Sequence, residues 1–421
     1  MKDNAAVTDT PRLLVFSSLF PHQGRPNAGL FIRERMFRVG QQLPIVVVAP
    51  VPWFPLQGIL RKFRPHFRPP APRFEVQDGV EVYYPRFLCV PGLFKTFDGF
   101  FMAIGSFMRV RKLRQRFGFN LIDAHFAYPD GYAATLLGRW FKAPVTITLR
   151  GTEVPHAKTA RRSFLVKALR SSARVFSVAD SLKQFVVSLG IDAEHVLVVG
   201  NGVDTKKFYA LNKRDTRETL NIPDNVPVLI SVGGLVERKG FHRVIECLPA
   251  LVGQFPGLLY LVIGGASAEG DWGDRLKQQV KQLGLEKTVR FLGAMPPEQL
   301  KTPLSSADVF VLATSNEGWA NVFLEAMACA LPVVTTRVGG NAEAVANSTV
   351  GLLVPFGDST ALEAALAEAL SQHWDREAIV NYANNNTWDK RISLLVNEYY
   401  AILNKSPDRR RDAHRPDAGA Q

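Results

Sequence analysis

Thr314–Val334 reads TSNEGWANVFLEAMACALPVV, and this stretch determines how the rest of the chain is interpreted. The residues before it, Asp308–Ala313, form a nearly continuous apolar run of the kind that fills a parallel strand buried on both faces. The stretch therefore opens at the carboxyl end of a strand, where open α/β sheets bind ligands. We predict an N-cap at Asn321, a helix over Val322–Ala330 and a stop at Leu331-Pro332.

Two glutamates flank the start of this predicted helix. Glu317 falls in the loop and Glu325 on the second helical turn, while Gly318 and the first free helix N–H groups offer an uncharged anion site between them. Carboxylate oxygens accept sugar hydroxyls and backbone N–H groups hold phosphate, so the arrangement suits a polyol phosphate. Without the surrounding sequence, the same spacing is equally explained by two unrelated glutamates on the surface.

The surrounding motif favours the first interpretation. EGWANVFLEAMA, followed by PVVTT and then VGGNAE up to Glu343, resembles the nucleotide-sugar motif of the family 4 retaining glycosyltransferases, in which seven residues separate two glutamates. The resemblance spans Arg12–Ala401 and implies an α/β chain of GT-B architecture, with two facing Rossmann-like doubly wound parallel-sheet domains and an interdomain cleft. It further implies transfer of a sugar from a nucleotide-diphosphate sugar to an acceptor such as a lipid-linked saccharide, in exopolysaccharide or lipopolysaccharide biosynthesis.

Strand and helix patterns alternate along the second half of the chain, as a doubly wound parallel sheet requires. The predicted strands there are Val228–Val232, Leu258–Ile263, Val289–Leu292 and Val309–Leu312. We expect an acceptor-side domain over residues 1–205, a polar linker over Lys206–Asn225 and a nucleotide-sugar domain over 206–387. A helix over 388–403 is expected to cross back to the first domain, and residues 404–421 are expected to be a disordered tail.

Composition limits the class of protein. The 421 residues suffice for two core-bearing domains, and three scattered cysteines support neither a disulfide framework nor a zinc site. No signal peptide and no apolar run long enough to span a membrane are found, which favours the cytoplasm. A net charge of +13 favours an acidic partner, but no nucleic-acid-binding motif accompanies it.

Ser231–Gly240, which reads SVGGLVERKG, lies between a strand and a helix. It is not a P-loop, because no Ser or Thr follows its Lys-Gly to hold magnesium. It resembles the family's diphosphate loop, where an Arg and a Lys commonly hold the leaving diphosphate. Lys239 matches the Lys, whereas Gly234 stands at the Arg position, and Arg238 either replaces the lost charge or points to solvent.

The resemblance also implies a set of site residues. Glu317, Lys239 and His125 are the expected catalytic residues, with His125 contacting the sugar from the opposite domain. The expected donor-binding residues are Gly29, Gly234, Arg238, Lys239, Gly293, Glu317, Gly318, Trp319, Ala320, Asn321, Val322 and Glu325. The expected substrate is a UDP- or GDP-sugar, with no cofactor; no metal-binding Asp-x-Asp is found or needed, because fixed cations can stabilise the leaving group.

Two arginines of the first half are further candidates for donor or acceptor contact. Arg33 follows the Gly/Pro-rich loop that ends at Gly29, and Arg150 ends a predicted strand. Arg150 and Glu153 both depart from the family's usual His-Gly-Thr-Asp at that position, which leaves their roles open.

An aromatic run followed by a basic run extends from Leu93 to Phe119. This pattern suits an interfacial helix on an anionic membrane, as does the basic insertion over Arg61–Arg73, and predicts peripheral attachment to the inner face of the cytoplasmic membrane. A core helix with a solvated basic end explains the same pattern.

Two alternatives to transfer remain at this point. A nucleotide-sugar epimerase or a phosphorylase would use the same architecture. The presence of Gly234 where the family commonly has an arginine would also fit a catalytically silent sugar-nucleotide-binding subunit.

Overall fold

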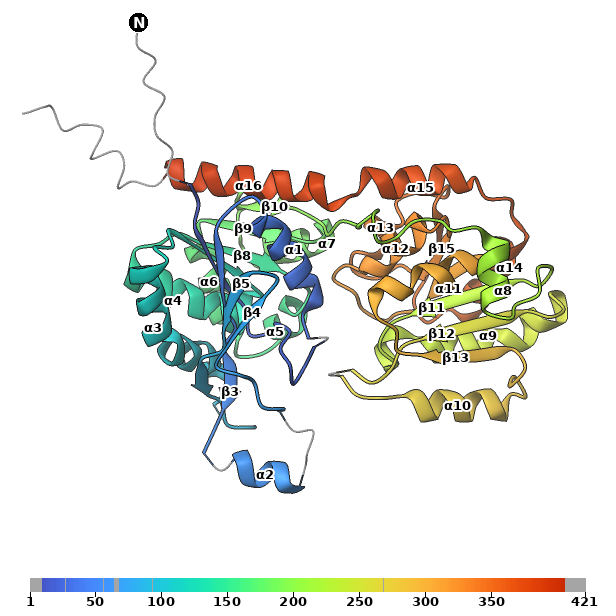
Figure 1. Cartoon of the computed structure of the whole chain (residues 1–421), viewed down its shortest axis with the longest axis horizontal. Helices are drawn as coiled ribbons and strands as arrows, with labels where there is room; N and C mark the ends of the chain where they lie inside the picture. The colour runs from blue at the N-terminus through green and yellow to red at the C-terminus, as the bar shows by residue number, and fades with distance from the viewer. Residues whose placement is uncertain are drawn as a thin grey trace, which may run out of the picture. The chain divides into compact units, whose positions relative to one another are not determined.

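The computed structural model describes residues 10–26, 28–55, 57–63, 68–92, 94–267 and 269–405. The chain divides into two compact units. The first contains the residues up to Val178, Leu182–Val199 and those from Ile392 onward, and the second contains Ala179–Ser181 and Gly200–Arg391. Each unit has its own main sheet (Figure 1).

The first unit is built on an eight-stranded sheet in the order β10-β9-β8-β7-β1-β2-β5-β4. All neighbours pair in parallel except β4 with β5. Its central strands are buried throughout, as the apolar composition of parallel strands predicts. The strands are β1 (Leu13–Phe16), β2 (Ile45–Val48), β4 (Phe74–Gln77), β5 (Val80–Tyr83), β7 (Leu121–His125), β8 (Val145–Leu149), β9 (Arg174–Ser177) and β10 (Val196–Val198).

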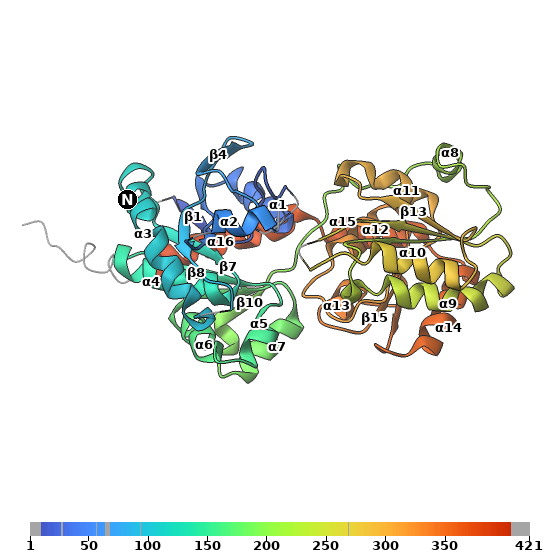
Figure 2. The same ribbon diagram turned by 90° about the horizontal axis from the view of Figure 1, so that it is seen from below.

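Helices cover both faces of this sheet. The long helix α3 lies beside α4, as Figures 1 and 2 both show. A separate parallel pair, β3 (Val51–Trp53) and β6 (Arg86–Leu88), stands outside the main sheet. The helices of this part of the chain are α1 (Leu30–Gly40), α2 (Gln57–Phe63), α3 (Asp98–Arg116), α4 (Tyr132–Phe141), α5 (Glu153–Ala157), α6 (Arg162–Ser171), α7 (Asp180–Ser188) and α16 (Trp388–Lys405).

The second unit has a fully parallel six-stranded sheet in the order β13-β12-β11-β14-β15-β16. Its strands are β11 (Val228–Val232), β12 (Leu259–Ile263), β13 (Val289–Gly293), β14 (Val309–Leu312), β15 (Val333–Thr336) and β16 (Gly351–Val354). The chain adds strands outward from β11 in one direction and from β14 in the other. The strand order therefore reverses between β11 and β14, and such a switch point is where doubly wound sheets bind ligands.

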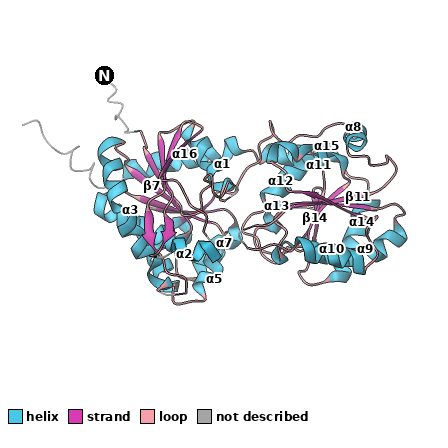
Figure 3. Ribbon diagram, turned by 60° about the horizontal axis from the view of Figure 1, so that its bottom comes forward, coloured by secondary structure: helices cyan, strands magenta, loops and turns pink. Residues whose placement is uncertain are grey.

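Figure 3 shows this sheet between two groups of helices. On one side are α11 (Lys301–Ser306), α12 (Asn321–Ala328) and α15 (Arg376–Asn385); on the other are α9 (Phe241–Gln254), α10 (Gly273–Gln282) and α14 (Ser359–Ser371). Two shorter helices, α8 (Lys213–Thr219) and α13 (Asn341–Ala344), complete the unit. The prediction of two parallel-sheet α/β domains is confirmed.

One local prediction needs correction, and the structure refines another. The segment predicted as a polar linker holds α8, and Arg217 on this helix is 3% exposed and pairs with Asp308 at 2.9 Å. The predicted interfacial run is only partly exposed, because α3 buries Met102, Val110 and Leu113 in the core. The tail beyond Lys405, Leu93 and residues 64–67 of the basic insertion lie outside the described residues.

Candidate donor site

Two loops meet at the switch point of the second sheet. One follows β11 and contains a short 3₁₀ turn, Glu237–Lys239, followed by Gly240 at the N-cap of α9. The other follows β14 and leads into α12. Gly240 has a φ of 75°, and a Cβ there would lie 1.9 Å from the carbonyl oxygen of Ala313, so only glycine lets the two loops approach this closely.

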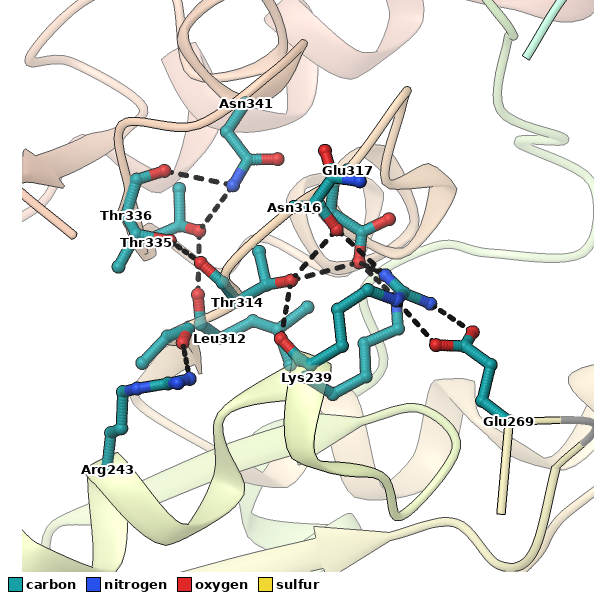
Figure 4. Close-up of polar contacts among 12 residues, drawn as sticks. Lys239, Arg243, Glu269, Leu312, Thr314, Asn316, Glu317, Thr335, Thr336 and Asn341 are labelled. Carbon is teal, nitrogen blue, oxygen red and sulfur yellow. Dashed lines mark hydrogen bonds and ion pairs between the residues drawn. The ribbon is translucent and has the colours of Figure 1, made fainter. Parts of the chain in front are cut away.

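The two cations of the first loop converge on the carboxylate of the second. Lys239 Nζ lies 2.5 Å from Glu317 Oε1, and Arg238 Nη1 lies 2.9 Å from the same oxygen (Figure 4). The Glu317 side chain is 9% exposed. A carboxylate this buried requires such partners, because an unpaired charge is costly to desolvate.

Arg238 does not point to solvent. Its Nε and Nη2 donate to the two carboxylate oxygens of Glu269 at 2.8 and 2.6 Å, and its Nη1 also donates to the carbonyl of Asn316 at 2.8 Å. The hydrogen bonds to Glu269 raise the pKa of Arg238, and the same contact lowers the pKa of Glu269. Glu269 lies in the loop after β12, where no sequence signal had indicated a site residue.

Threonine and asparagine side chains hold the loop that carries Glu317 (Figure 4). The Thr314 hydroxyl lies 3.3 Å from Glu317 Oε1 and 2.9 Å from the carbonyl of Arg238. Thr336 Oγ1 donates to the Thr314 carbonyl at 2.5 Å, and Asn341 Nδ2 donates to the Thr336 carbonyl at 2.9 Å. This network links the ends of β14 and β15, and all three side chains are buried.

The glycines of the VGGNAE motif place a third loop, between β15 and α13, against the backbone of Glu317. Gly339 has a φ of 48°, and a Cβ there would lie 1.8 Å from the Glu317 carbonyl oxygen. A Cβ on Gly340 would lie 2.4 Å from the Gly318 carbonyl oxygen, and the Gly340 N–H donates to the backbone carbonyl of Glu317 at 3.2 Å. Both glycines are therefore required by backbone contact.

The start of α12 differs from the prediction. The N-cap position is Ala320, which makes no side-chain capping bond, and Asn321 is the first helical residue. Asn321 Oδ1 instead accepts a hydrogen bond from Asn201 Nδ2 at 2.8 Å. The first N–H groups of this helix, at Asn321 and Val322, are consequently left without a side-chain cap, as an anion site requires.

The other predicted donor-binding residues of the second unit lie along the same sheet edge. Trp319 packs its indole against Gly200, where a Cβ would lie 3.1 Å from the ring, and Glu325 is partly buried on α12. Gly234 follows β11, and a Cβ there would lie 3.0 Å from the Cβ of Ser267. Gly293 ends β13, two strands from β11, and has a φ of 76°.

In the first unit, His125 ends β7 and is fully buried. Its Nε2 lies 3.3 Å from Asp123 Oδ2, and its Nδ1 lies 3.1 Å from Arg150 Nη2. Burial lowers the pKa of His125 to about 4, so the ring is neutral at pH 7. The contact of Nδ1 places His125 to orient Arg150, whereas Nε2 faces Asp123 without a hydrogen bond. The burial of His125 does not support the expected direct contact with a sugar.

Glu153, the second departure from the family pattern, has a local structural role. Its carboxylate accepts the backbone N–H groups of Ala127, Arg150 and Gly151 at 3.2, 3.2 and 2.7 Å. It is fully buried, and burial raises its pKa. Gly29 has a φ of 70° at the start of α1, and the Arg33 guanidinium pairs with Asp78 at 2.5 Å on the surface.

Asp130 is a residue that the sequence interpretation missed. It is 1% exposed, and its carboxylate accepts both the backbone N–H and the hydroxyl of Ser18, in the loop after β1. Burial raises its pKa to about 7. Its position in the YPDG sequence after β7 is the only signal that pointed to it.

Within the described ranges, no group of three or more His, Cys, Asp or Glu side chains is arranged to hold a metal ion. Among the same residues, no helix is both long and apolar enough to cross a bilayer.

Two family models match the chain. Residues 212–386 match Glycosyl transferases group 1, and residues 61–207 match Glycosyltransferase Family 4. The chain is 32% identical over 311 residues to the D-inositol 3-phosphate glycosyltransferase of Corynebacterium urealyticum, covering 69% of this chain and 73% of that protein. It is 26% identical over 388 residues to a Bacillus subtilis glycosyltransferase assigned to teichuronic acid biosynthesis, covering 91% and 92%.

Solved structures show the same architecture. Anabaena HepE in complex with UDP aligns with a TM-score of 0.70 at 19% identity, covering 93% of this chain and 100% of that one. Two parallel-sheet α/β units, the second with cation-bearing loops at its switch point, define the GT-B class of glycosyltransferases. Within that class, this chain belongs to glycosyltransferase family 4, in the group 1 set.

Proposed function

We propose that this glycosyltransferase is a retaining, metal-independent hexosyltransferase that uses a UDP- or GDP-sugar. The observation that carries the proposal is the convergence of Lys239 and Arg238 on Glu317 beside the uncapped start of α12. UDP in the complex of HepE supports a nucleotide-diphosphate donor. The relative assigned to teichuronic acid biosynthesis supports a role in surface polysaccharide assembly, with a lipid-linked saccharide as acceptor.

Each residue at the switch point has a role in this reaction. As the bond from the anomeric carbon to the diphosphate breaks, negative charge grows on the leaving oxygens, and fixed cations stabilise it. Lys239, Arg238 and the first N–H groups of α12 supply that stabilisation, which is why the proposal needs no metal. Glu317 accepts hydrogen bonds from hydroxyls of the transferred sugar, and Glu325 accepts hydrogen bonds from the ribose hydroxyls.

The remaining donor-binding residues shape this site. Backbone groups of the loop before α12 are proposed to contact the donor, together with the glycines after β11 and β13 and the glycine that starts α1. These residues are Gly318, Trp319, Ala320, Asn321, Val322, Gly234, Gly293 and Gly29. His125 is assigned a positioning role, holding Arg150, and Arg33 and Arg150 are retained as residues for donor or acceptor contact.

Arg238 argues against a catalytically silent subunit. The usual Arg position of the loop holds Gly234, but the Arg238 guanidinium lies within 2.9 Å of Glu317 and so keeps two cations at the site. A silent binding subunit would not need the second cation beside the reacting sugar. We therefore propose that Arg238 replaces the missing arginine.

We also propose peripheral attachment to the inner face of the cytoplasmic membrane through α3. Its exposed face and its N-cap residue Phe97 form an apolar stripe that consists of Phe97, Phe100, Ile104 and Met108, which are 50%, 43%, 52% and 59% exposed. Lys112 continues the same helical face and is exposed, as is Arg111. Aromatic side chains beside cations suit the headgroup boundary of an anionic bilayer.

The proposed activity is tested by incubating the protein with single UDP- and GDP-hexoses, with and without a prenyl-linked saccharide, in the presence of EDTA. We expect acceptor-dependent release of one nucleoside diphosphate and a product whose anomeric configuration, measured by NMR, matches the donor. Turnover without acceptor would indicate an epimerase, and turnover that requires inorganic phosphate would indicate a phosphorylase. Nucleotide binding without turnover on any donor would support the silent subunit.

A further inference from the structure

A cavity of about 270 Å³ lies at the ligand-binding edge of the first sheet. Ser18, Leu19 and Phe20 follow β1 and form part of its wall, and Ala49 follows β2. The carboxyl ends of parallel strands are where open α/β sheets bind ligands. The position of this cavity therefore indicates a binding site in the unit that does not contain the donor loops.

The wall of the cavity is strongly basic. Four arginines line it, namely Arg25, Arg61, Arg68 and Arg86, and no acidic side chain is present among the described residues of its lining. Arg25 and Arg86 are exposed, and neither side chain makes a hydrogen bond or ion pair with another described residue. Two guanidinium groups that line a cavity and have no partner among the described residues suit a ligand with phosphate charges.

His22 adds a hydrogen-bond donor to the same wall. Its Nδ1 accepts the N–H of Gly24 at 3.1 Å, which leaves Nε2 to carry the proton of the neutral ring. Burial lowers the pKa of His22, so the ring is neutral at pH 7.

A second hollow, of about 320 Å³, adjoins the first across Tyr84 and Arg86, which line both. Its other cations are Arg73, Arg109 and Lys112. It is closed on one side by α3, where a Cβ on Gly105 would lie 2.5 Å from the carbonyl oxygen of Arg86. Met108 of the apolar stripe is part of its wall, so the two hollows, which share Tyr84 and Arg86, connect the exposed apolar face of α3 with the loop after β1.

We propose that the two adjoining basic hollows, together the basic trough, bind the phosphate or diphosphate of a lipid-linked acceptor, with the hydrocarbon chain leaving over the apolar stripe of α3. The inference rests on the proposed glycosyltransferase function and adds the chemistry by which the acceptor is recognised. The cations of the trough match the phosphates, and the adjoining apolar side chains match the lipid. A free phosphorylated saccharide would also bind the cations through its phosphate, but it has no hydrocarbon chain to contact the apolar stripe.

The test measures binding of farnesyl diphosphate and of inorganic pyrophosphate to the full chain by calorimetry, with saturating UDP to occupy the donor loops. Arg25→Gln combined with Arg86→Gln is the test variant, and Arg139→Gln, an exposed arginine of α4 in the same unit, is the matched control. We expect farnesyl diphosphate to bind at least tenfold more weakly to the double variant and equally to the control, because two charge-assisted contacts are lost. Pyrophosphate should bind more weakly than farnesyl diphosphate.

Equal affinity of the wild type and the double variant for farnesyl diphosphate would overturn the proposal. If pyrophosphate bound as tightly as farnesyl diphosphate and depended on the same arginines, the trough would be a phosphate-binding site. The proposal that its ligand is a lipid would then be refuted. UDP affinity is measured on every protein. Failure of the wild type to bind UDP or GDP would contradict the proposed function without affecting the result at the trough.

Discussion

Lys239 Nζ and Glu317 Oε1 lie 2.5 Å apart, although 78 positions separate them in the chain. The carboxylate holds the lysine and Arg238 at the switch point of the second sheet. In the proposed reaction, the diphosphate of the donor would engage the same cations. The contribution of each of the three side chains can therefore be tested separately.

Lys239→Ala should lower kcat/KM about 10- to 100-fold, because one charge-assisted contact to the leaving diphosphate is worth about 1.5 to 3 kcal/mol. Arg238→Ala should lower it less, since Glu269 holds that guanidinium in a second ion pair. Steady-state kinetics with the active donor measure both. A greater loss in Arg238→Ala would show that Arg238 has become the principal cation of the loop.

Glu269→Gln should tighten UDP binding by about two- to fivefold. The carboxylate is half exposed and pairs with Arg238, so its removal frees positive charge for the diphosphate, and solvent screening limits the gain to about 0.5 to 1 kcal/mol. Calorimetry at low and high salt measures the change, which should shrink as salt rises. Weaker UDP binding would mean that Glu269 instead holds Arg238 in its binding position.

Glu325→Ala should chiefly weaken nucleotide binding, whereas Glu317→Gln should chiefly lower kcat. The first residue is assigned to the ribose and the second to the reacting sugar, so their effects should differ in kind. Calorimetric UDP affinity and steady-state rates on both variants separate them. Unchanged UDP affinity in Glu325→Ala would refute the ribose assignment.

Asp130→Asn should remove a pH dependence of stability. The pKa of Asp130 is raised to about 7, above the value of about 3.9 for an unfolded chain, so the folded state binds more protons between these limits. Stability from this group is present at low pH and is lost as pH rises toward 7, by about 4 kcal/mol at most. Urea unfolding at pH 5 and pH 7.5 should therefore show a larger decrease in the wild type than in the variant. Equal decreases would exclude Asp130 as the titrating group.

Membrane attachment through α3 is tested with two variants. Ile104→Ser with Met108→Ser removes apolar contact, and Arg111→Gln with Lys112→Gln removes charge. Arg109 and Arg114 are left intact because the first stacks on Tyr83 at 4.5 Å and the second donates to the Phe119 carbonyl. Both variants should sediment less with anionic vesicles than wild type, and only the charge variant should lose its sensitivity to salt. If both variants sedimented with anionic vesicles to the same extent as the wild type at low salt, α3 would not be part of the membrane-binding surface.

The sequence by itself determined the elements whose signal is local. Val228–Val232 and Val309–Leu312 form strands with the predicted limits, because an apolar, β-branched run is suited to a buried parallel strand wherever it pairs. Short sequence motifs were likewise enough to select four candidate site residues, namely Glu317, Glu325, Arg238 and Lys239. The glycines of VGGNAE were part of that motif, although the backbone contacts that require them were not visible in it.

Only the tertiary structure decided which side chains meet across long separations. Arg238 turns toward Glu317 because Glu269, from a different loop, holds its other edge, and no periodicity encodes that pairing. Asn321 bonds to Asn201, 120 positions away, in place of capping its own helix. His125 is at a strand end, as the sequence indicates, but its burial between Asp123 and Arg150 depends on how neighbouring strands pack. Such contacts form only when distant segments are brought together by the fold, so local sequence patterns do not contain them.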